Sequence, residues 1–525
     1  MAKEEAEMSV NRLNKTENTL RNIVFGLFGT GAGLLFPFIV RTVLIYRYGE
    51  DYLGLNGVFQ SIITVLNLAE LGFSSSVVFS LYKPIAENDV KTVNAYLAYF
   101  RKVYLTIGIV IAVAGTLLMP FLPLMIKDPT TPGNLNCYIW YLFFLSEAVI
   151  SYVFYGYKFI IPTAVQRNDM ISAVSMVTTT MKSVLQIIAL YVGNHYFIFL
   201  AMSPLMTIVH HAILAAVVTK RFPQYKPEGM ISKEQREEMR PLLAGILISK
   251  VRAVSRNSFD NICISTFIGL AAAGIYQNYF FIMTSISTVS GIITSSMLSG
   301  IGNSIVTDSI EKNYRDMRRF NFMFMIIAGW ASICLLCLYQ PFMDIWVGPT
   351  RMLGMAEVIA MSLYFYVLKL GDMRWTYTEG AGLWWKCRYL ALAEAACNMI
   401  LNVVLVRLFG VLGIISATLV SLIFIDNIFA TRIVFDEYFK NGKLREYFGD
   451  QLKYFLVSTL IAVITYALCW LVPFAGIGGL IVRILICGLV PWPIYYLIYR
   501  RSALYLDAKE WMLEFISRKR REKAQ

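Results

Sequence analysis

Fourteen apolar segments, each about as long as a membrane span, follow one another along the 525 residues of this chain. A helix needs about 20 mainly apolar residues to cross the hydrocarbon core of a bilayer. The segments lie near residues 23–46, 53–81, 103–126, 138–158, 169–192, 197–219, 242–266, 272–299, 320–343, 352–371, 388–408, 411–431, 454–473 and 477–499. The sequence therefore predicts an all-α polytopic membrane protein with about 14 transmembrane helices.

The distribution of Lys and Arg predicts the orientation of these spans. With a cytoplasmic amino terminus, 37 of these residues fall in predicted cytoplasmic segments and five in exterior connections. Both termini are predicted to be cytoplasmic, because cytoplasmic connections carry the excess of positive charge. The net charge of +13 then needs no nucleic-acid partner, since the basic residues form no continuous face. Residues 1–20 lack an apolar h-region, so we expect no cleaved signal peptide.

Of the 47 Lys and Arg residues, five lie inside predicted spans, and three of these five lie in the span 242–266. Ionisable groups inside a membrane are costly and usually face a bundle interior or a wet cavity. Arg252, Arg256 and Asp260 share one helix face at four-residue spacing, and Lys250 lies just before them. This stripe either binds an anionic headgroup or is structural, with Arg256 and Asp260 neutralising each other and Lys250 reaching the cytoplasmic surface.

Arg41 and Lys182 are the other two cations inside predicted spans. Arg41 shares a helix face with Gly33 and Pro37, a combination that suits a bending helix beside a cavity. Lys182 lies halfway along its span, and Glu147, halfway along the preceding span, is its expected partner. The pair is either a structural contact or part of a substrate path.

Further polar residues interrupt two other spans. Glu70 lies in the middle of the predicted span 53–81. Glu394, Asn398 and Asn402 form a polar stripe at four-residue spacing in a later span. These side chains either bind sugar hydroxyls or a coupling ion, or hold helices together by hydrogen bonds.

No catalytic or metal-binding constellation is apparent in the sequence. Cys334 and Cys337 form a C-x-x-C motif, but no second pair and no nearby histidine accompanies it, so we predict no metal or redox site. The three histidines form no metal set with an acid, and no nucleophile lies near a base in the sequence. The short exterior connections also lack reactive acids. We therefore predict a transporter, with no catalytic residue, metal or organic cofactor.

A long polar link at 220–240, with two prolines, divides the first twelve spans into two sets of six. Residues 52–89 and 272–308 share glycine spacing and serine-rich stretches, as expected of the parallel repeats found in transporters. The predicted parts are a lobe at 1–225, a lobe at 226–446, two appended helices at 447–499 and a basic cytoplasmic tail at 500–525.

Several blocks of the sequence carry a family resemblance. Residues 47–93 contain YLGLNG, LAELG and SLYKP, and similar blocks occur at 259–279, 299–304 and 381–421. These blocks closely resemble the Wzx-type flippases of polysaccharide biosynthesis, within the multidrug/oligosaccharidyl-lipid/polysaccharide exporter superfamily. The resemblance covers the first twelve spans. Its better-matched motif residues are Glu70, Lys83, Pro84 and Asp260.

The resemblance implies a V-shaped fold of two lobes and a function in the bacterial cytoplasmic membrane. Such a flippase moves an undecaprenyl-pyrophosphate-linked oligosaccharide from the inner to the outer leaflet, for assembly of a cell-surface polysaccharide. The implied cavity cations that meet the pyrophosphate are, by their placement in the spans, Arg41, Lys182, Arg252 and Arg256. The implied partners are this substrate, membrane lipids, and the polysaccharide polymerase and glycosyltransferases.

The sequence leaves the driving force and three alternative functions open. The drive is either the membrane potential or proton or sodium coupling through Glu70, Glu147 or Asp260. The alternatives are a lipid II flippase for peptidoglycan, a cation-coupled multidrug exporter and a membrane polysaccharide polymerase. A multidrug exporter would need an acidic pocket, whereas the ionisable residues in these spans are mostly basic. A polymerase would need reactive acids on a sizeable exterior loop.

Overall fold

The computed structural model of the protein describes residues 15–69, 73–127, 132–165, 167–192, 196–440 and 442–524, and these residues form helices and connections without any strand. Within them, nine helices are long and apolar enough to cross a membrane. The count becomes ten if the bent pair Cys137–Val153 and Gly156–Ala164, with an angle of 58°, is one span. The prediction of an all-α polytopic membrane protein is confirmed.

The helices form two compact units, Met1–Ala273 and Gly274–Gln525. The division lies after α10 (Lys233–Phe267), whereas the sequence suggested a division after residue 225. The difference arises because α10 packs on α3 (Glu50–Leu66) and α4 (Phe73–Ala86), which belong to the first unit.

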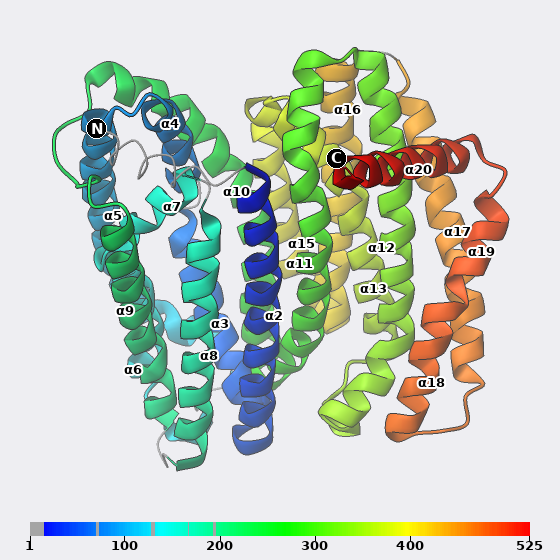
Figure 1. The fold of residues 1–525 in the computed structure, drawn as a ribbon. Helices are drawn as coiled ribbons and strands as arrows, with labels where there is room; N and C mark the ends of the chain where they lie inside the picture. The colour runs from blue at the N-terminus through cyan, green and yellow to red at the C-terminus, as the bar shows by residue number, and fades with distance from the viewer. Residues whose placement is uncertain are drawn as a thin grey trace. The chain divides into compact units, whose positions relative to one another are not determined.

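In the first unit, neighbouring helices pack in a row (Figure 1). α2 packs on α8, α8 on α9, α9 on α6, and α6 on α5. The bounds of these helices are Lys15–Tyr48 for α2, Val90–Leu118 for α5, Cys137–Val153 for α6, Asn168–Val192 for α8 and Tyr196–Arg221 for α9. Shorter elements are η1 (Asn67–Ala69), η2 (Met119–Met125), η3 (Pro132–Asn134), η4 (Gly156–Phe159) and α7 (Ile160–Ala164).

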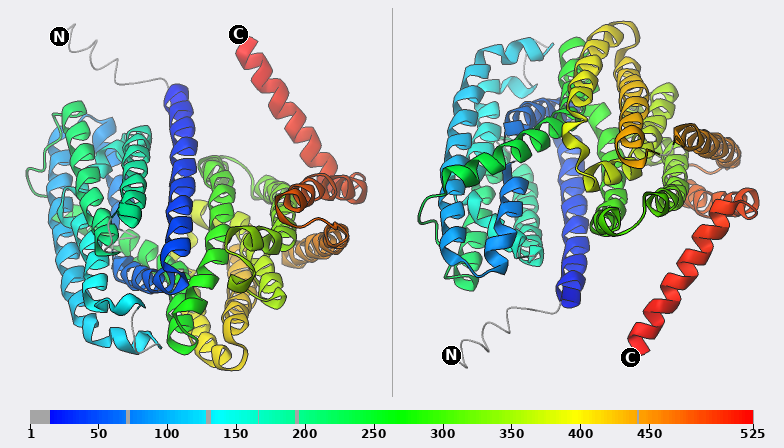
Figure 2. Two further views of the ribbon diagram at one scale, coloured as in Figure 1. Left: turned by 90° about the horizontal axis from the view of Figure 1, so that it is seen from below. Right: turned by 90° about the horizontal axis from the view of Figure 1, so that it is seen from above.

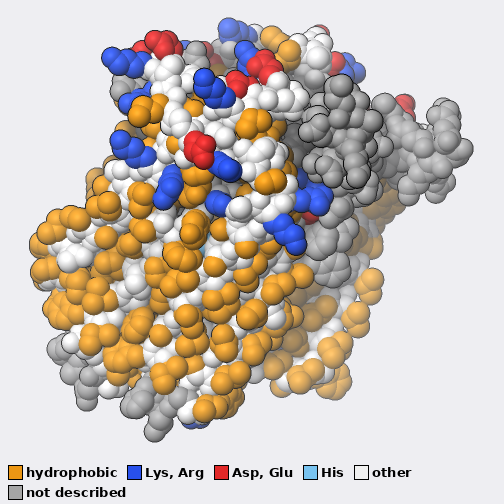
Figure 3. All heavy atoms as spheres, turned by 60° about the vertical axis from the view of Figure 1, so that its left-hand side comes forward, with side chains coloured by type: hydrophobic (Ala, Val, Ile, Leu, Met, Phe, Trp, Pro, Cys, Tyr) orange, Lys and Arg blue, Asp and Glu red, His pale blue; other side chains and the backbone are white. Residues whose placement is uncertain are grey.

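The outer face of this row is apolar, as a lipid-facing surface should be. On α5, the exposed residues Leu105, Ile109, Val113 and Leu117 follow one another at four-residue spacing. Figure 3 shows hydrophobic side chains over this broad face of the unit, with Lys, Arg, Asp and Glu gathered at one end. The separation of apolar and charged surface marks where hydrocarbon ends and water begins.

An aromatic cluster joins the predicted exterior ends of four helices in the first unit. The rings of Tyr52 and Tyr196 lie 4.8 Å apart, and each lies 4.5–5.3 Å from the rings of Tyr48 and Trp140, centroid to centroid. Asn56 accepts a hydrogen bond from Trp140 Nε1 at 2.8 Å and donates one to the Tyr196 hydroxyl at 2.7 Å. Tyr and Trp favour this depth because their rings are apolar and their polar ends reach water.

The second unit is built around α12 (Ile310–Trp346), which packs on α13, α17, α18 and α20. Its other elements are α11 (Leu270–Thr307), η5 (Pro349–Arg351), α13 (Met355–Leu370), α14 (Asp372–Gly380), η6 (Leu383–Trp385), α15 (Arg388–Val420), η7 (Ser421–Ala430), α16 (Thr431–Val434), η8 (Phe435–Phe439), α17 (Leu444–Trp470), α18 (Gly476–Leu489), α19 (Pro491–Tyr499) and α20 (Ala503–Ala524). α20 begins against α12, where its Asp507 is paired with Arg319 at 2.6 Å, and its C-terminal part extends away from the other helices (Figure 2).

Each of the fourteen predicted segments coincides with helical structure, but two details differ from the prediction. Within the span expected at 53–81, α3 ends at Leu66 and a 3-10 turn, η1, follows at Asn67–Ala69, before α4 at Phe73–Ala86. The segments 388–408 and 411–431 follow each other directly and are separated at Gly410, whose φ of 58° and ψ of −133° are not helical. Glycine alone adopts such a backbone readily, which explains how two helices can meet without a loop.

Replacing Gly410 should therefore destabilise the second unit. Any side chain at this φ and ψ introduces strain of about 1–3 kcal/mol. We expect Gly410→Ala to lower the thermal unfolding midpoint of the protein in detergent. Gly488→Ala is the matched control, because Gly488 is helical and an added Cβ would meet nothing within 4 Å. Equal unfolding midpoints for the two variants would contradict this role of Gly410.

Candidate functional site

The polar face of α10 is buried within the first unit. Arg256 and Asp260 lie one turn apart, and their exposed fractions are 9% and 1%. Lys250 and Arg252 also belong to α10, although their side chains lie outside the described residues. The structure therefore keeps the predicted stripe on one continuous helix, with its described members inside the protein.

Hydrogen bonds hold the predicted exterior end of α10 in place. Asn261 Nδ2 donates to Ser61 Oγ of α3 at 3.2 Å. Ser265 Oγ donates to the Met125 carbonyl at 2.6 Å, and Lys127 N donates to the Ser265 carbonyl at 3.1 Å. Arg256 is five residues before Asn261, about 8 Å along the helix axis. Arg256 thus belongs to a helix that is anchored at its far end.

The helices α2 and α8 run side by side in the same direction (Figure 1). A Cβ on Gly29 would lie 3.6 Å from Ser172. Nearer the other end, the Arg47 guanidinium lies 5.5 Å from the centroid of the Tyr191 ring. The two contacts have nearly the same sequence offset, so the register between the two helices is constant over this length.

This register places two of the predicted cavity cations at similar depth. Extending it puts Arg41 opposite residues 184–185 of α8. Lys182 is two to three residues away, or about 3–5 Å along the axis. The first unit therefore presents Arg41 and Lys182 at nearly one level of the membrane.

The expected pair between Glu147 and Lys182 is present. Lys182 Nζ lies 3.7 Å from Glu147 Oε1, and the two side chains are 33% and 30% exposed. Thr207 Oγ1 of α9 donates to the same carboxylate oxygen at 3.5 Å. These distances exceed the roughly 2.7–2.9 Å of a short charge-assisted hydrogen bond. The pair is loose and about one-third exposed, unlike a fully buried structural ion pair.

Two further hydrogen bonds extend this contact into a ladder between α8 and α9. Gln186 Nε2 donates to Ser203 Oγ at 3.2 Å, and Thr178 Oγ1 lies 2.9 Å from His210 Nδ1. Sequence reasoning missed these partners. The signal was available, because Thr178, Lys182 and Gln186 recur every four residues along one helix face.

Glu70 falls between η1 and α4 and lies outside the described residues. The sequence placed it in the middle of a continuous span. Before this position, α3 ends at Leu66 and η1 covers Asn67–Ala69.

The polar stripe of α15 is buried between the two arms that meet at Gly410. Glu394, Asn398 and Asn402 have exposed fractions of 2% or less. Asn398 Nδ2 donates to Thr418 Oγ1 of the other arm at 3.0 Å, and Asn402 Nδ2 donates to Asn398 Oδ1 at 3.3 Å. For Asn398, this favours the alternative in which polar side chains hold helices together.

A buried ion pair in the second unit was not predicted. Arg374 Nη2 lies 2.8 Å from Asp426 Oδ2, with the two side chains 1% and 7% exposed. Arg374 Nη1 also donates to the Asp426 carbonyl, and Trp375 Nε1 donates to its carboxylate at 3.2 Å. From the sequence, Arg374 belonged to a cytoplasmic connection. The missed signal was Asp426, a carboxylate inside a predicted span that required a partner.

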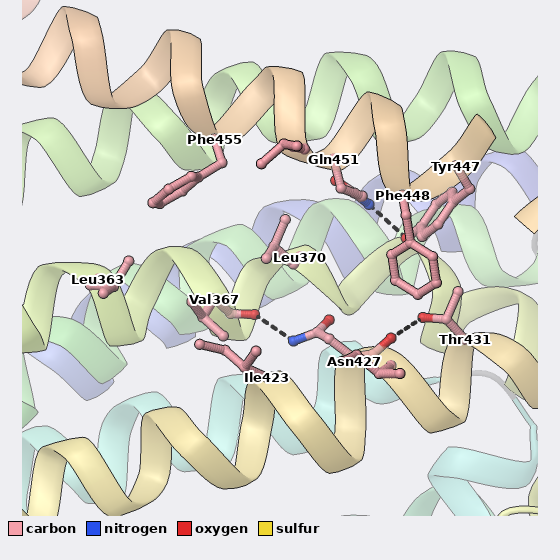
Figure 4. Close-up of a pocket in the computed structure, with 12 residues that line it drawn as sticks. Leu363, Val367, Leu370, Ile423, Asn427, Thr431, Tyr447, Phe448, Gln451 and Phe455 are labelled. Carbon is pink, nitrogen blue, oxygen red and sulfur yellow. Dashed lines mark hydrogen bonds between the residues drawn. The ribbon is translucent and has the colours of Figure 1, made fainter. Parts of the chain in front are cut away.

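An apolar pocket lies between α13, η7, α16 and α17 (Figure 4). We call it the α17 pocket, and its volume is about 340 Å³. Asn427 Nδ2 donates to the Val367 carbonyl at 3.3 Å, and Gln451 Nε2 donates to the Tyr447 hydroxyl at 2.6 Å. These bonds engage the polar groups of the wall and leave it mainly hydrophobic. Its lining residues are Leu363, Val367, Leu370, Ile423, Asn427, Ile428, Thr431, Tyr447, Phe448, Gln451, Leu452 and Phe455.

No protein-family model matches this sequence, and no curated protein matches it significantly. Solved structures match its fold. The lipid II flippase MurJ, in an inward closed conformation, has a TM-score of 0.64 at 15% identity, covering 92% of this chain and 99% of MurJ. The chain has the MurJ fold.

MATE transporters share this fold at lower similarity. An inward-facing multidrug resistance MATE transporter of the MOP superfamily has a TM-score of 0.58 at 12% identity, covering 78% of this chain and 96% of its own. A mutant of the Vibrio cholerae MATE transporter VcmN has a TM-score of 0.55 at 15% identity, covering 82% and 98%. Both flippases and drug transporters thus have the fold of this chain.

The ion pair between Arg374 and Asp426 should be essential for folding of the second unit. Breaking a buried pair leaves an uncompensated charge and costs about 3–5 kcal/mol. We expect Arg374→Met to reduce the amount of folded protein in membranes and to lower its thermal unfolding midpoint. Arg432→Met is the control, because the Arg432–Asp436 pair is 68% and 63% exposed. Wild-type stability of Arg374→Met would contradict this role.

Proposed function

We propose that the protein is a flippase that carries an undecaprenyl-pyrophosphate-linked oligosaccharide from the cytoplasmic to the outer leaflet of a bacterial cytoplasmic membrane. The observation that carries this proposal is a MurJ-like fold whose spans contain several basic residues. The product would supply the assembly of a cell-surface polysaccharide. Polysaccharide polymerase and glycosyltransferases would be its functional partners.

The chemistry of the headgroup explains why basic residues are needed. A pyrophosphate cannot cross hydrocarbon unaccompanied, because burial of an unpaired charge costs far more than a single contact returns. Guanidinium groups can replace its water with bidentate, charge-assisted hydrogen bonds. We assign this role to Arg41, Arg252 and Arg256, with Lys182 and Lys250 as further cations.

The contact between Glu147 and Lys182 suggests how a headgroup could be accepted. At 3.7 Å and about one-third exposed, the pair is accessible and weakly held. A pyrophosphate oxygen could displace the Glu147 carboxylate from Lys182 without leaving either group fully buried. Lys182 would thereby exchange one anionic partner for another during transport, with Arg41 at nearly the same depth.

The lipid tail need not leave the hydrocarbon during transport. The α17 pocket is apolar and borders α17, the first of the two appended helices. Its volume of about 340 Å³ lies within the usual range of ligand pockets. We propose that a segment of the polyprenyl chain occupies it.

Alternating access by movement of the two halves of the chain would complete the cycle. An inside-negative membrane potential favours outward movement of negative charge by about 2.3 kcal/mol per charge per 100 mV. Proton or sodium coupling through Glu70, Glu147 or Asp260 is the alternative drive. No organic cofactor or bound metal is required for this transport.

A lipid II flippase is the second candidate function. MurJ, a lipid II flippase, has a higher TM-score than the MATE structures above. Both candidate substrates would present a pyrophosphate on a polyprenyl chain, so both require the same basic residues. A multidrug exporter is less favoured because the intramembrane ionisable residues are mostly basic.

Complementation should separate the two candidates. We expect the wild-type protein to restore polymer export in a strain that lacks its Wzx-type flippase. It should fail to restore growth in a strain depleted of its lipid II flippase. The reverse result would identify a lipid II flippase, and failure in both strains would contradict transport of either lipid-linked saccharide.

The same export assay tests the basic residues of α10. A hydrogen bond to a charged group contributes about 1.5–3 kcal/mol, so Arg252→Ala and Arg256→Ala should each reduce export at least about tenfold. Arg236→Ala is the control, since Arg236 is exposed near the start of the same helix. Export is compared at equal amounts of folded protein in membranes. Unimpaired export by both variants would remove α10 from the mechanism.

Filling the α17 pocket should impair transport without unfolding the protein. We expect Leu370→Trp to reduce export severalfold, because the larger side chain would occupy space proposed for the lipid tail. Leu456→Trp is the control, since Leu456 is 57% exposed on α17 and does not line the pocket. Equal export by the two variants, at equal protein levels, would exclude the pocket from lipid binding.

A further inference from the structure

Three cysteine thiols from distant parts of the sequence meet inside the second unit. Cys337 belongs to α12, Cys469 to the end of α17 and Cys487 to α18. Their exposed fractions are 3%, 3% and 1%. All three sulfur atoms lie within 4.8 Å of one another. We call this group the thiol cluster.

Cys334, the neighbour of Cys337 in the C-x-x-C motif, is not part of the thiol cluster. Cys334 and Cys337 form the C-x-x-C motif, yet Cys337 is grouped with Cys469 and Cys487 and not with Cys334. Among the described residues, the thiol cluster is the one group of three His, Cys, Asp or Glu side chains whose ligand atoms all lie within 4.8 Å of one another. All three of its ligand atoms are thiol sulfurs. Such a donor set favours a thiophilic cation over a hard one.

Neighbouring contacts fix the position of α18 against α12. Pro491 has no N–H, so it cannot bond to the Cys487 carbonyl four residues earlier. Trp330 Nε1 of α12 donates to this carbonyl instead, at 2.8 Å. The backbone of Cys487 is therefore held to the helix that carries Cys337.

The spacing of the sulfur atoms fits a shared metal ion better than a disulfide. Cys469 Sγ and Cys487 Sγ are 3.9 Å apart. Three sulfurs at about 2.3 Å from one ion in a plane are about 4.0 Å from one another. A disulfide requires about 2.05 Å between its sulfurs, which would need a much larger displacement.

The charge balance also suits a divalent ion. Three thiolates and one divalent cation together carry a single negative charge. Arg483 of α18 lies beside the cluster, and its Nε donates to the Cys469 carbonyl at 3.2 Å. Its other nitrogens donate to the Val472 and Phe474 carbonyls at 3.2 Å, which fixes the guanidinium at the end of α17. The net charge of the metal-bound cluster and the Arg483 guanidinium together is zero, which a low-dielectric interior favours.

We propose that Cys337, Cys469 and Cys487 form a binding site for one thiophilic divalent cation of the Zn(II) and Cd(II) class. Binding would replace the three thiol protons, which are released to solvent, by three metal–sulfur bonds. The ion would connect α18 to both α12 and α17. This proposal is independent of the transported substrate.

Metal binding to the reduced, purified full-length protein tests the site. Cd(II) is the probe, with thiolate-to-cadmium charge-transfer absorption and metal analysis after desalting as readouts. We expect one Cd(II) per chain, a raised thermal unfolding midpoint, and at least tenfold weaker binding after Cys337→Ser, Cys469→Ser or Cys487→Ser. Cys334→Ser is the matched control on the same helix and should bind Cd(II) as the wild type does.

Differential alkylation of the wild-type protein gives a readout that requires no variant. Under partially denaturing conditions, Cd(II) should slow modification of Cys337, Cys469 and Cys487, as followed by mass spectrometry, and should leave Cys263 unaffected. Absence of saturable binding, equal binding by all variants, or protection of other cysteines would overturn the proposal. Two results together would also overturn it. These are a Cys469–Cys487 disulfide in protein isolated without reductant, and no binding of Cd(II) to these cysteines after mild reduction of that disulfide.

Discussion

The cost of placing polar groups in hydrocarbon governs how this chain is organised. Helices satisfy their own backbone groups, so every segment that crosses the membrane is helical in the described residues. Polar side chains then need partners of their own. Arg374 and Asp426 meet this need directly, at 2.8 Å and with almost no exposure. Asn398 and Thr418 do so with a neutral hydrogen bond between two helical arms.

Two ion pairs inside predicted spans or their connections differ in solvent exposure and in the distance between their charged atoms. The Arg374–Asp426 pair is closed, so it serves the packing of the second unit. The Glu147–Lys182 pair is longer and about one-third exposed, which lets either partner exchange for another charged group. The ladder between α8 and α9 keeps this pair in position through Gln186 and Thr178. Exposure and distance thus separate a structural pair from a candidate transport residue.

Irregular backbone in the second unit has identifiable causes. Gly410 allows two helices to meet without a loop. Proline at position 491 frees the Cys487 carbonyl, which then binds Trp330. The π-helical segment η7 carries Asp426 toward Arg374 and Asn427 toward the Val367 carbonyl. Each irregularity brings a side chain to a partner that a regular α-helix would not offer at the same place.

The sequence was sufficient for features that depend on local composition. Segment length and hydrophobicity predicted the helices because a span must match the bilayer thickness. Four-residue spacing predicted that Arg256 and Asp260 share one helix face, and mid-span position predicted the pair of Glu147 with Lys182. The change from α3 to the 3-10 turn η1 at Asn67 was not predicted, because a run of apolar residues does not reveal where an α-helix ends.

The tertiary structure decided which distant residues meet. Arg374 pairs with Asp426, Cys337 groups with Cys469 and Cys487, and α10 packs with the helices that precede it. None of these contacts follows from spacing along the chain. The hydrophobic spans have similar compositions, so composition does not reveal which spans pack against one another. Sequence therefore determined that polar groups in the membrane need partners, and only the fold determined which partners they have.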